Sequence, residues 1–393
     1  MRVRIIFHAQ NVVGFIKKHR GKKMNKYVKK EDEKFPEELV RNPYGYIKNY
    51  YESVYLDMGN RVFSILALVI PSLILPDIPH KNSRNIKSGI NFLLIAPPGT
   101  AKSSLCETFE KLAYNSFPFE SITDSKLYSM LSQRDYVSLV VGDVFKVFSD
   151  KLLTKSMENV LGDEQKISRL TQRTGDTEKK IKAVAFLAGT PNALTSIIQE
   201  GILFRTAISL IFHNEDEHEE IGEYISDGAF EKKEVNGEED KIIEYYQELL
   251  KIQTDRHEIK PIKGYIFDKK LREQLIKEWK PLVKPMVTRT KFAFFRELHQ
   301  GMRYACSHCF LNIFQREIID DKIVITQEDV NIAKKLMKKE LETKYKILTC
   351  SRVVSEEKLK TVNDLSSWVD KQKVKKKVNI NKESVNIMGS LIK

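Results

Sequence analysis

Residues 90–105 read INFLLIAPPGTAKSSL, and this stretch decides the expected fold. Residues 90–95 form a short apolar run of the kind that makes a buried parallel strand. A loop at 96–101 follows, and we expect a helix to start near Lys102. A strand, a Pro/Gly-containing loop ending in Lys-Ser and a helix, in that order, are the context in which such a loop binds phosphates.

The expected ligand of this loop is ATP with Mg²⁺. Main-chain N–H groups of the loop and the positive end of the helix would surround the phosphates. Lys102 supplies a charge for the outer phosphates, and the Ser103 hydroxyl supplies a magnesium ligand. We expect Ala101, which replaces a usual glycine, to sit on the first helical turn at little cost. The predicted nucleotide contacts are Ala96, Pro97, Pro98, Gly99, Thr100, Ala101, Lys102, Ser103 and Ser104.

Further apolar runs lie at 136–141 and 183–188, with another candidate strand at 208–212, and helical or loop segments separate them. Strands that alternate with helices predict an α/β fold with a doubly wound parallel sheet. From Lys241 to about Tyr345 the apolar spacing is helical. The acidic stretch 214–240 before it has little apolar content and is expected to be a surface insertion.

The chain divides into four expected parts: a basic N-terminal arm at 1–42, an α/β ATPase domain at 43–240, an α-helical domain at 241–350 and a basic tail at 351–393. Within the second part, a helical pattern runs to Pro71 and Pro76, which end it because proline lacks an N–H. At the other end, Thr326 followed by acidic residues predicts a helix start.

Net charge and hydropathy indicate which classes of partner to expect. Apolar residues make up 41% of the chain, which supports a packed core, and the net charge is +13. That excess favours a polyanionic partner, nucleic acid before a membrane surface, although a basic surface that binds nothing is the alternative. The most apolar stretch, 62–75, is shorter than the about twenty residues of a membrane helix. No signal-peptide core precedes it, so a cytoplasmic protein without membrane contact is expected.

Cysteine usage points to buried thiols. The chain has four cysteines, and Cys306 and Cys309 lie close together in the sequence. No second pair follows at zinc spacing, and the surrounding segment has the pattern of an amphipathic helix. We therefore expect structural thiols rather than a metal site.

The stretch 90–105 resembles the corresponding part of the minichromosome maintenance (MCM) helicases. Their loop reads Gly-Asp-Pro-Gly-x-Ala-Lys-Ser, and the alanine before the lysine is distinctive. The resemblance implies an AAA+ P-loop NTPase whose α/β domain is followed by an α-helical lid. It also implies a homo-hexameric motor that hydrolyses ATP while moving on DNA.

Residues 136–143, YVSLVVGD, are similar to the family's Walker B strand, which ends in an acid. Asp143 would hold Mg²⁺ through water. In the family a glutamate follows and polarises the attacking water, whereas Val144 stands here. Glu158 or Asp150 is a candidate replacement, or turnover is slow.

Two further segments resemble family elements around the sheet. Residues 185–192 are similar to the sensor 1 strand, which implies that Thr190 or Asn192 hydrogen-bonds the γ-phosphate or the lytic water; an ordinary turn is the alternative. Residues 166–175 have hairpin character and lie where the family carries a pre-sensor 1 hairpin. Its candidate DNA-binding residues, which would grip phosphates without reading bases, are Lys166, Arg169 and Arg173. A solvated basic loop is the competing interpretation.

Two arginines complete the resemblance. Arg205, in ILFRTAISLIF, falls on the family's arginine finger, which reaches the γ-phosphate of a neighbouring subunit. A surface arginine is the alternative. Arg289, in Thr-Arg-Thr, matches the sensor 2 arginine that opens the helical lid.

Three functions follow from these patterns. The first is a hexameric ATPase that translocates on or unwinds DNA in replication, a helicase core. The second is an AAA+ switch or loader that remodels a partner without unwinding. The third is a silent ATP-binding assembly protein, which the intact Lys102, Ser103 and Asp143 disfavour.

Overall fold

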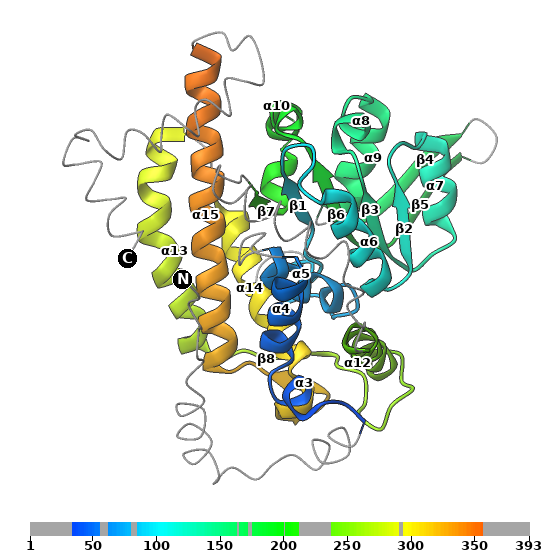
Figure 1. The fold of residues 1–393 in the computed structure, drawn as a ribbon, viewed down its shortest axis with the longest axis vertical. Coiled ribbons are helices and arrows are strands. Elements are labelled where there is room, and N and C mark those ends of the chain that lie inside the picture. Colours follow the sequence, from blue (N-terminus) through cyan, green and yellow to red (C-terminus); the bar gives the residue numbers. More distant parts are fainter. Residues whose placement is uncertain are drawn as a thin grey trace, which may run out of the picture.

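The computed structural model describes residues 34–55, 62–79, 85–162, 165–171, 175–199, 201–211, 237–290 and 294–356. A five-stranded parallel sheet with helices around it occupies one side, and a group of C-terminal helices packs beside it (Figure 1). Residues 1–33 of the predicted arm, 357–393 of the predicted tail and most of the acidic stretch lie outside the described residues. The predicted boundary at 42 is too late, because residues 37–41 already form a helix that buries Leu39 and Val40.

The central sheet confirms the predicted α/β class. Its strand order is β2-β3-β6-β1-β7, and every pairing is parallel. The second strand is the one that the sequence did not predict, because it contains Pro118 and its side chains are mostly only half buried. The strands of this sheet are β1 (Phe92–Ile95), β2 (Ser116–Phe119), β3 (Tyr136–Val141), β6 (Lys182–Gly189) and β7 (Ala207–Leu210).

Helices cover the sheet on both faces. The connection from β1 to β2 crosses the sheet in one direction. The later connections, from β2 through β3 and β6 to β7, cross it in the other. Because each crossover is right-handed, the two sets of helices lie on opposite faces. On the first face, the Phe109 ring stacks on Phe186 with centroids 5.2 Å apart, and Phe186 meets Phe92 edge-on at 5.4 Å. The helices involved are α6 (Lys102–Leu112), α7 (Asp124–Ser132), α8 (Val144–Phe148), α9 (Lys151–Leu161), α10 (Leu194–Gln199) and the short η1 (Pro191–Ala193) and η2 (Ile202–Arg205).

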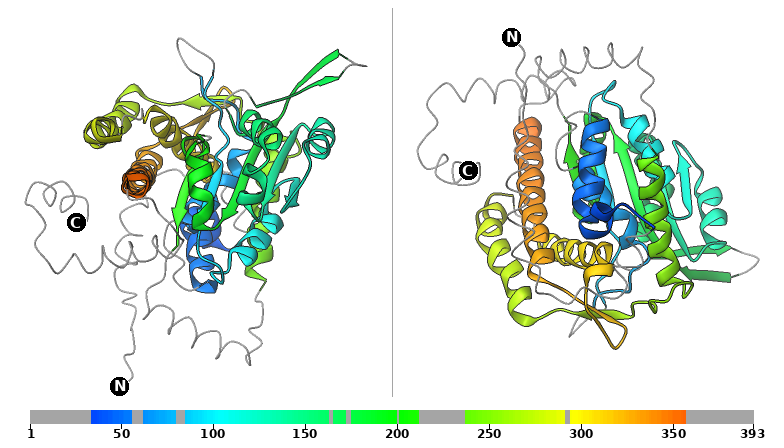
Figure 2. Two further views of the ribbon diagram at one scale, coloured as in Figure 1. Left: turned by 90° about the horizontal axis from the view of Figure 1, so that it is seen from above. Right: turned by 60° about the horizontal axis from the view of Figure 1, so that its bottom comes forward.

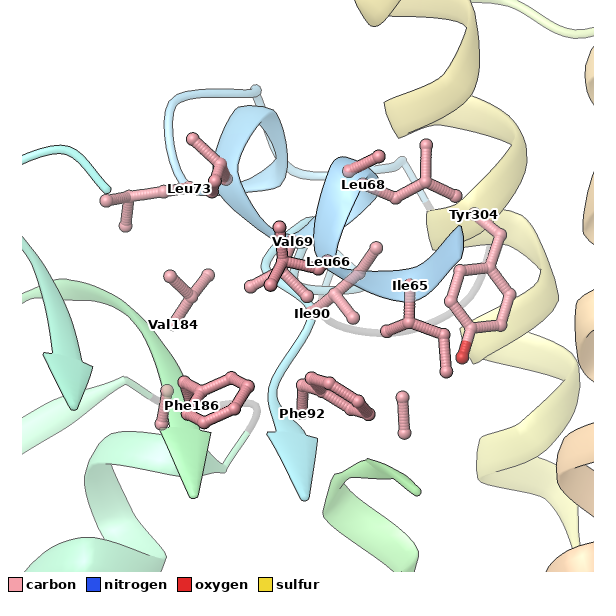
Figure 3. Packing of buried hydrophobic residues seen from close by; sticks show 14 of the residues in the cluster. Ile65, Leu66, Leu68, Val69, Leu73, Ile90, Phe92, Val184, Phe186 and Tyr304 are labelled. Carbon is pink, nitrogen blue, oxygen red and sulfur yellow. The ribbon is translucent and has the colours of Figure 1, made fainter. Parts of the chain in front are cut away.

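The N-terminal helices α3 (Glu37–Arg41), α4 (Pro43–Val54) and α5 (Val62–Ser72) join the sheet to the C-terminal helices. Every residue of α5 is buried, and Figure 3 shows it between the Phe92–Phe186 pair and Tyr304. Pro71 lies inside its last turn instead of stopping the helix before it. The apolar stretch is thus a core helix, and none of the described helices is long and apolar enough to span a bilayer.

The C-terminal part is helical, as predicted, with a small sheet that was not predicted. That sheet has the order β8-β10-β9, and Tyr265 on its first strand donates to Pro76 O at 2.9 Å. In Figure 1, α13 and α15 lie side by side, and α15 also contacts β7 at the edge of the central sheet. The elements are α12 (Glu238–Gln253), β8 (Gly264–Ile266), α13 (Lys269–Thr290), α14 (Phe295–Leu311), η3 (Ile313–Gln315), β9 (Ile318–Ile319), β10 (Lys322–Val324) and α15 (Gln327–Glu356).

Helix α15 begins at the predicted place through a buried polar cluster. Asp329, the third helical residue, accepts hydrogen bonds from the backbone N–H and the hydroxyl of Thr326 at 2.7 and 2.8 Å. Arg316 donates to Asp329 at 2.7 Å, and His308 Nδ1 lies 2.7 Å away. On the neighbouring α14, Cys306 and Cys309 are buried thiols, as expected.

Candidate nucleotide-binding site

Three adjacent strands bring the predicted site residues to one edge of the sheet. Ile95 pairs with Gly189, and Val141 pairs with Leu187, so β1, β6 and β3 end within two residues of one another at the carboxyl edge. Ala96 N donates to Gly189 O at 3.0 Å, which continues the pairing of β1 and β6 into the loop. The connections that leave β1 and β6 run in opposite directions across the sheet. Open parallel sheets usually bind their ligands in the crevice between two such neighbouring strands.

The loop from Ala96 to Ala101 turns on two residues with left-handed backbone. Gly99 has φ 81°, a region that only glycine adopts freely. Ala101 has φ 51° and caps α6 from outside its first turn. The expectation that it sits on the first turn was therefore wrong, and its Cβ costs about 1–2 kcal/mol in this conformation. Thr100 Oγ1 donates to Pro97 O at 2.6 Å and braces the loop.

Lys102 folds back over the loop. Its ammonium donates to Ala96 O at 2.9 Å and also to Pro97 O. Partial burial lowers the pKa of Lys102, while the nearby Cys106 and Asp143 act in the opposite direction. The cation is thus held by weak neutral acceptors at the mouth of the loop.

The two serines after Lys102 lie in the first turn of α6 and are exposed. Tyr55 at the end of α4 donates to Ser104 O at 3.2 Å, which ties the N-terminal helices to the loop. Ser103 has an accessible hydroxyl next to the loop, at the positive end of α6.

Asp143 follows β3 and caps α8. One carboxylate oxygen accepts from Phe145 N at 3.1 Å, the other lies 3.7 Å from Lys146 Nζ, and the side chain is 35% exposed. A carboxylate and a hydroxyl are hard oxygen donors, and magnesium is usually held by one or two carboxylates together with substrate phosphates. Asp143 and Ser103 therefore fit that role, although the described residues contain no group of three acidic, His or Cys ligands.

Val144, which stands where a catalytic glutamate was expected, faces the core. It is 0% exposed and lies against Gly189 at the end of β6. Because Asp143 is the cap and Val144 the first residue of α8, this side chain points under the helix and away from the crevice. The structure thus shows why the position is apolar.

Thr190 and Asn192 lie at the same edge. Thr190 follows Gly189 directly, is half buried and precedes η1 without making a side-chain cap. Asn192 lies within η1 and is exposed. Both polar groups are available beside the loop.

No family model and no curated protein matches this chain. The geometry of the sheet edge and the residues that reach it therefore carry the functional inference.

Arg205 and Glu158 lie at the other edge of the sheet. Arg205 precedes β7, its carbonyl accepts from Asn91 at the start of β1, and its guanidinium donates to Glu158 at 2.8 Å. Five residues of strand, about 17 Å, separate Asn91 from Ala96. Within one molecule, Arg205 does not reach Lys102, and Glu158 is in the wrong place to replace the missing glutamate.

The Asp150 carboxylate is likewise hydrogen-bonded within the protein. It accepts from Leu152 N and Leu153 N at 2.8 and 3.1 Å, and so caps α9. The N-cap role accounts for an aspartate at position 150 without any catalytic function.

The predicted hairpin is present. Strands β4 (Lys166–Thr171) and β5 (Gly175–Lys180) are antiparallel, and the pair extends away from the sheet (Figure 2). Ile181 N donates to Gln165 O at its base, close to the amino ends of β3 and β6. Lys166 and Arg169 lie on β4, whereas Arg173 lies outside the described residues.

Arg289 lies near the end of α13, one residue before its last. Its backbone is part of the helix, and its side chain lies outside the described set. The lid was expected to open at Arg289, whereas the 22-residue α13 of the C-terminal part ends there.

One carboxylate at the crevice was not anticipated. Glu120 follows β2, next to Asp143 across the sheet, and its side chain is 75% exposed. Residues 117–119 are Phe-Pro-Phe, and the aromatic alternation was the one available signal for an edge strand. Recognising that strand would have placed Glu120 at the same edge as the loop.

Proposed function

We propose that the chain is an AAA+ ATPase that binds ATP at the carboxyl edge of its sheet, with the C-terminal helices as its lid. The observation that carries this proposal is the convergence of the Ala96–Ser103 loop, Asp143 and Thr190 at the ends of three adjacent strands. Phosphates bind at such edges because main-chain amides and a helix N-terminus point toward them.

Each residue has a role in this proposal. Lys102 exchanges its two carbonyl partners for the β- and γ-phosphate oxygens, which are stronger acceptors. Ser103 and Asp143 hold Mg²⁺, which when bound neutralises phosphate charge. Thr190 or Asn192 hydrogen-bonds the γ-phosphate or the attacking water.

Assembly into a homo-hexamer is part of the proposal. Arg205 lies at the edge opposite to the nucleotide, and its ion pair with Glu158 holds it half buried there. A cation in this place acts on the site of a neighbouring copy rather than its own. Arg289 is proposed as a second phosphate contact, from the lid.

DNA is the proposed polyanionic partner, in replication. The β4–β5 hairpin extends from the sheet and carries Lys166 and Arg169 on β4, and the whole chain has a net charge of +13. Contacts of this kind bind the phosphate backbone regardless of base sequence.

A switch or loader is the second candidate. The burial of Val144 favours it, because a site without a glutamate at this position holds ATP longer before hydrolysis. The two functions differ in whether DNA accelerates turnover.

The test is the ATPase rate with and without single-stranded DNA, alongside the mass of the assembled particle. A DNA translocase is expected to form a hexamer and to hydrolyse ATP faster with DNA. Arg169→Ala with Arg173→Ala should weaken DNA binding and reduce its salt dependence, while ATP affinity is kept. Lys335→Ala with Lys346→Ala, on exposed positions of α15, removes the same charge elsewhere as the control. Equal DNA affinity in both double variants would argue against the hairpin.

A further inference from the structure

The buried Val144 leaves the proposed ATPase without the carboxylate that usually activates water. Such a group must lie at the carboxyl edge, beside the magnesium ligand, and must be free to reach a water molecule. The inference below rests on the proposed ATPase and concerns which side chain supplies this carboxylate.

Glu120 is held against the segment that carries Asp143. Phe119 pairs with Val141, and Gly142 N donates to Phe119 O at 3.1 Å, so β2 and β3 end together. A Cβ built on Gly142 would lie 3.3 Å from Glu120 Cγ, which shows that the Glu120 side chain lies over Gly142. Glycine at 142 leaves the room for this approach.

A shared cation links the two carboxylates. Lys146 Nζ lies 3.4 Å from Glu120 Oε2 and 3.7 Å from Asp143 Oδ2. Two carboxylates that share one ammonium group must lie on the same side of β3. Glu120 therefore faces the crevice at which Asp143 ends the strand.

Glu120 also lies near α6, the helix that follows the loop. Burial, together with the charges of Glu107 and Glu120, raises the pKa of Cys106 to about 12. Cys106 is four residues after Lys102 and so lies on the same side of α6. Glu120 thus lies near the side of α6 that carries Cys106.

The other candidate carboxylates are committed elsewhere. Asp150 caps α9, and Glu158 pairs with Arg205 at the opposite edge of the sheet. Glu120 has only the long contact with Lys146 among the described residues, and three quarters of its side chain is exposed. It is free to turn toward a bound triphosphate.

We propose that Glu120 is the catalytic residue that orients and deprotonates the attacking water. The water oxygen forms a bond to the γ-phosphorus, and the bond from that phosphorus to the bridging oxygen breaks. ADP leaves with the electron pair of the broken bond. The proton of the water passes to the Glu120 carboxylate and then to the released phosphate.

The test compares Glu120→Gln with Glu107→Gln. Glu107 is an exposed glutamate within α6 and, unlike Glu120, does not follow the end of a strand. Glu120→Gln keeps the shape and the exposure of the side chain, so the fold is preserved. We expect its kcat for ATP to fall by about 100-fold or more, with ATP affinity within about threefold of the wild type. The protein should also retain unhydrolysed ATP after gel filtration, a readout independent of rate. Glu107→Gln should match the wild type.

A kcat of Glu120→Gln within about threefold of the wild type would overturn this role. Wild-type protein that binds ATP without hydrolysing it would overturn it too. A wild type that binds no ATP would instead overturn the proposed function itself, which separates the two failures.

Discussion

Gly189 and Val144 lie in contact beneath the candidate site. Only glycine at position 189 permits this contact, because any side chain there would collide with Val144. A Cβ added to Gly189 would come within 2.3 Å of Val144 Cγ2. Real Cβ atoms do not approach other heavy atoms this closely, so the end of β6 and the start of α8 fit together through the missing side chain. This contact fixes the level at which Asp143 and Thr190 leave their strands.

Gly189→Ala should destabilise the protein by about 1–3 kcal/mol, because the added methyl overpacks the contact. Val144→Ala removes the methyl groups that clash, so the double variant should lose less stability than the sum of the two single ones. Urea unfolding of the four proteins measures this coupling. Strict additivity would contradict the packing described here.

Val144→Glu should not restore a catalytic glutamate. The carboxylate would be buried without a partner, at a cost of about 3 kcal/mol or more. Phe145→Glu is the matched control, since Phe145 is 49% exposed and next in the chain. Thermal unfolding should show a large loss for the first variant and little change for the second. A stable Val144→Glu protein with faster ATP turnover would show that position 144 faces the crevice.

Ala101→Gly should stabilise the protein by about 1 kcal/mol, because glycine adopts φ 51° without the Cβ penalty. Ala113→Gly, at the other end of α6, has φ −80° and gains nothing from glycine. That control should lose stability through the more flexible unfolded chain. Urea unfolding of both variants gives the sign, and a loss in Ala101→Gly would show that the strain is absent.

Asp329 should make stability depend on acid pH. Burial raises the pKa of Asp329, but the contact with His308 and the charge of Arg316 outweigh it and lower the pKa to about 2. An aspartate in the unfolded chain titrates near 3.9, so about 2.6 kcal/mol of stability is present well above pH 4 and is lost as the pH falls through 4 toward 2.

Asp329→Asn tests this dependence. The stability difference from the wild type should be full at pH 5 and should shrink toward pH 2 in denaturant unfolding. Asp135→Asn is the control, because Asp135 is almost fully exposed. A difference that stays constant between pH 5 and 2 would contradict the role of the ion cluster.

The sequence predicted those parts of the fold that local chemistry decides. The apolar runs at β1, β3 and β6 were found because buried parallel strands are apolar throughout, and Thr326 marked the start of α15. The loop, Lys102 and Asp143 were found because their order along the chain is itself the signal.

Other features depend on tertiary placement, which periodicity does not reveal. Glu120 belongs to the crevice only because β2 pairs with β3, and β2 contains Pro118. The sequence makes Glu158 a candidate base, but its side chain lies at the amino edge of the sheet, paired with Arg205. The sequence shows at position 144 only that an acid is missing, whereas the burial of Val144 against Gly189 follows from where α8 begins.

Binding of Mg-ATP by the wild type and by Lys102→Ala tests the central claim most directly. Lys111→Ala, an exposed lysine at the far end of the same helix, is the matched control. We predict saturable ATP binding by the wild type and by Lys111→Ala in titration calorimetry, and at least a tenfold weaker affinity in Lys102→Ala, about 1.4 kcal/mol. Equal affinity in all three proteins, or no binding by the wild type at millimolar ATP, would contradict a triphosphate site at this edge of the sheet.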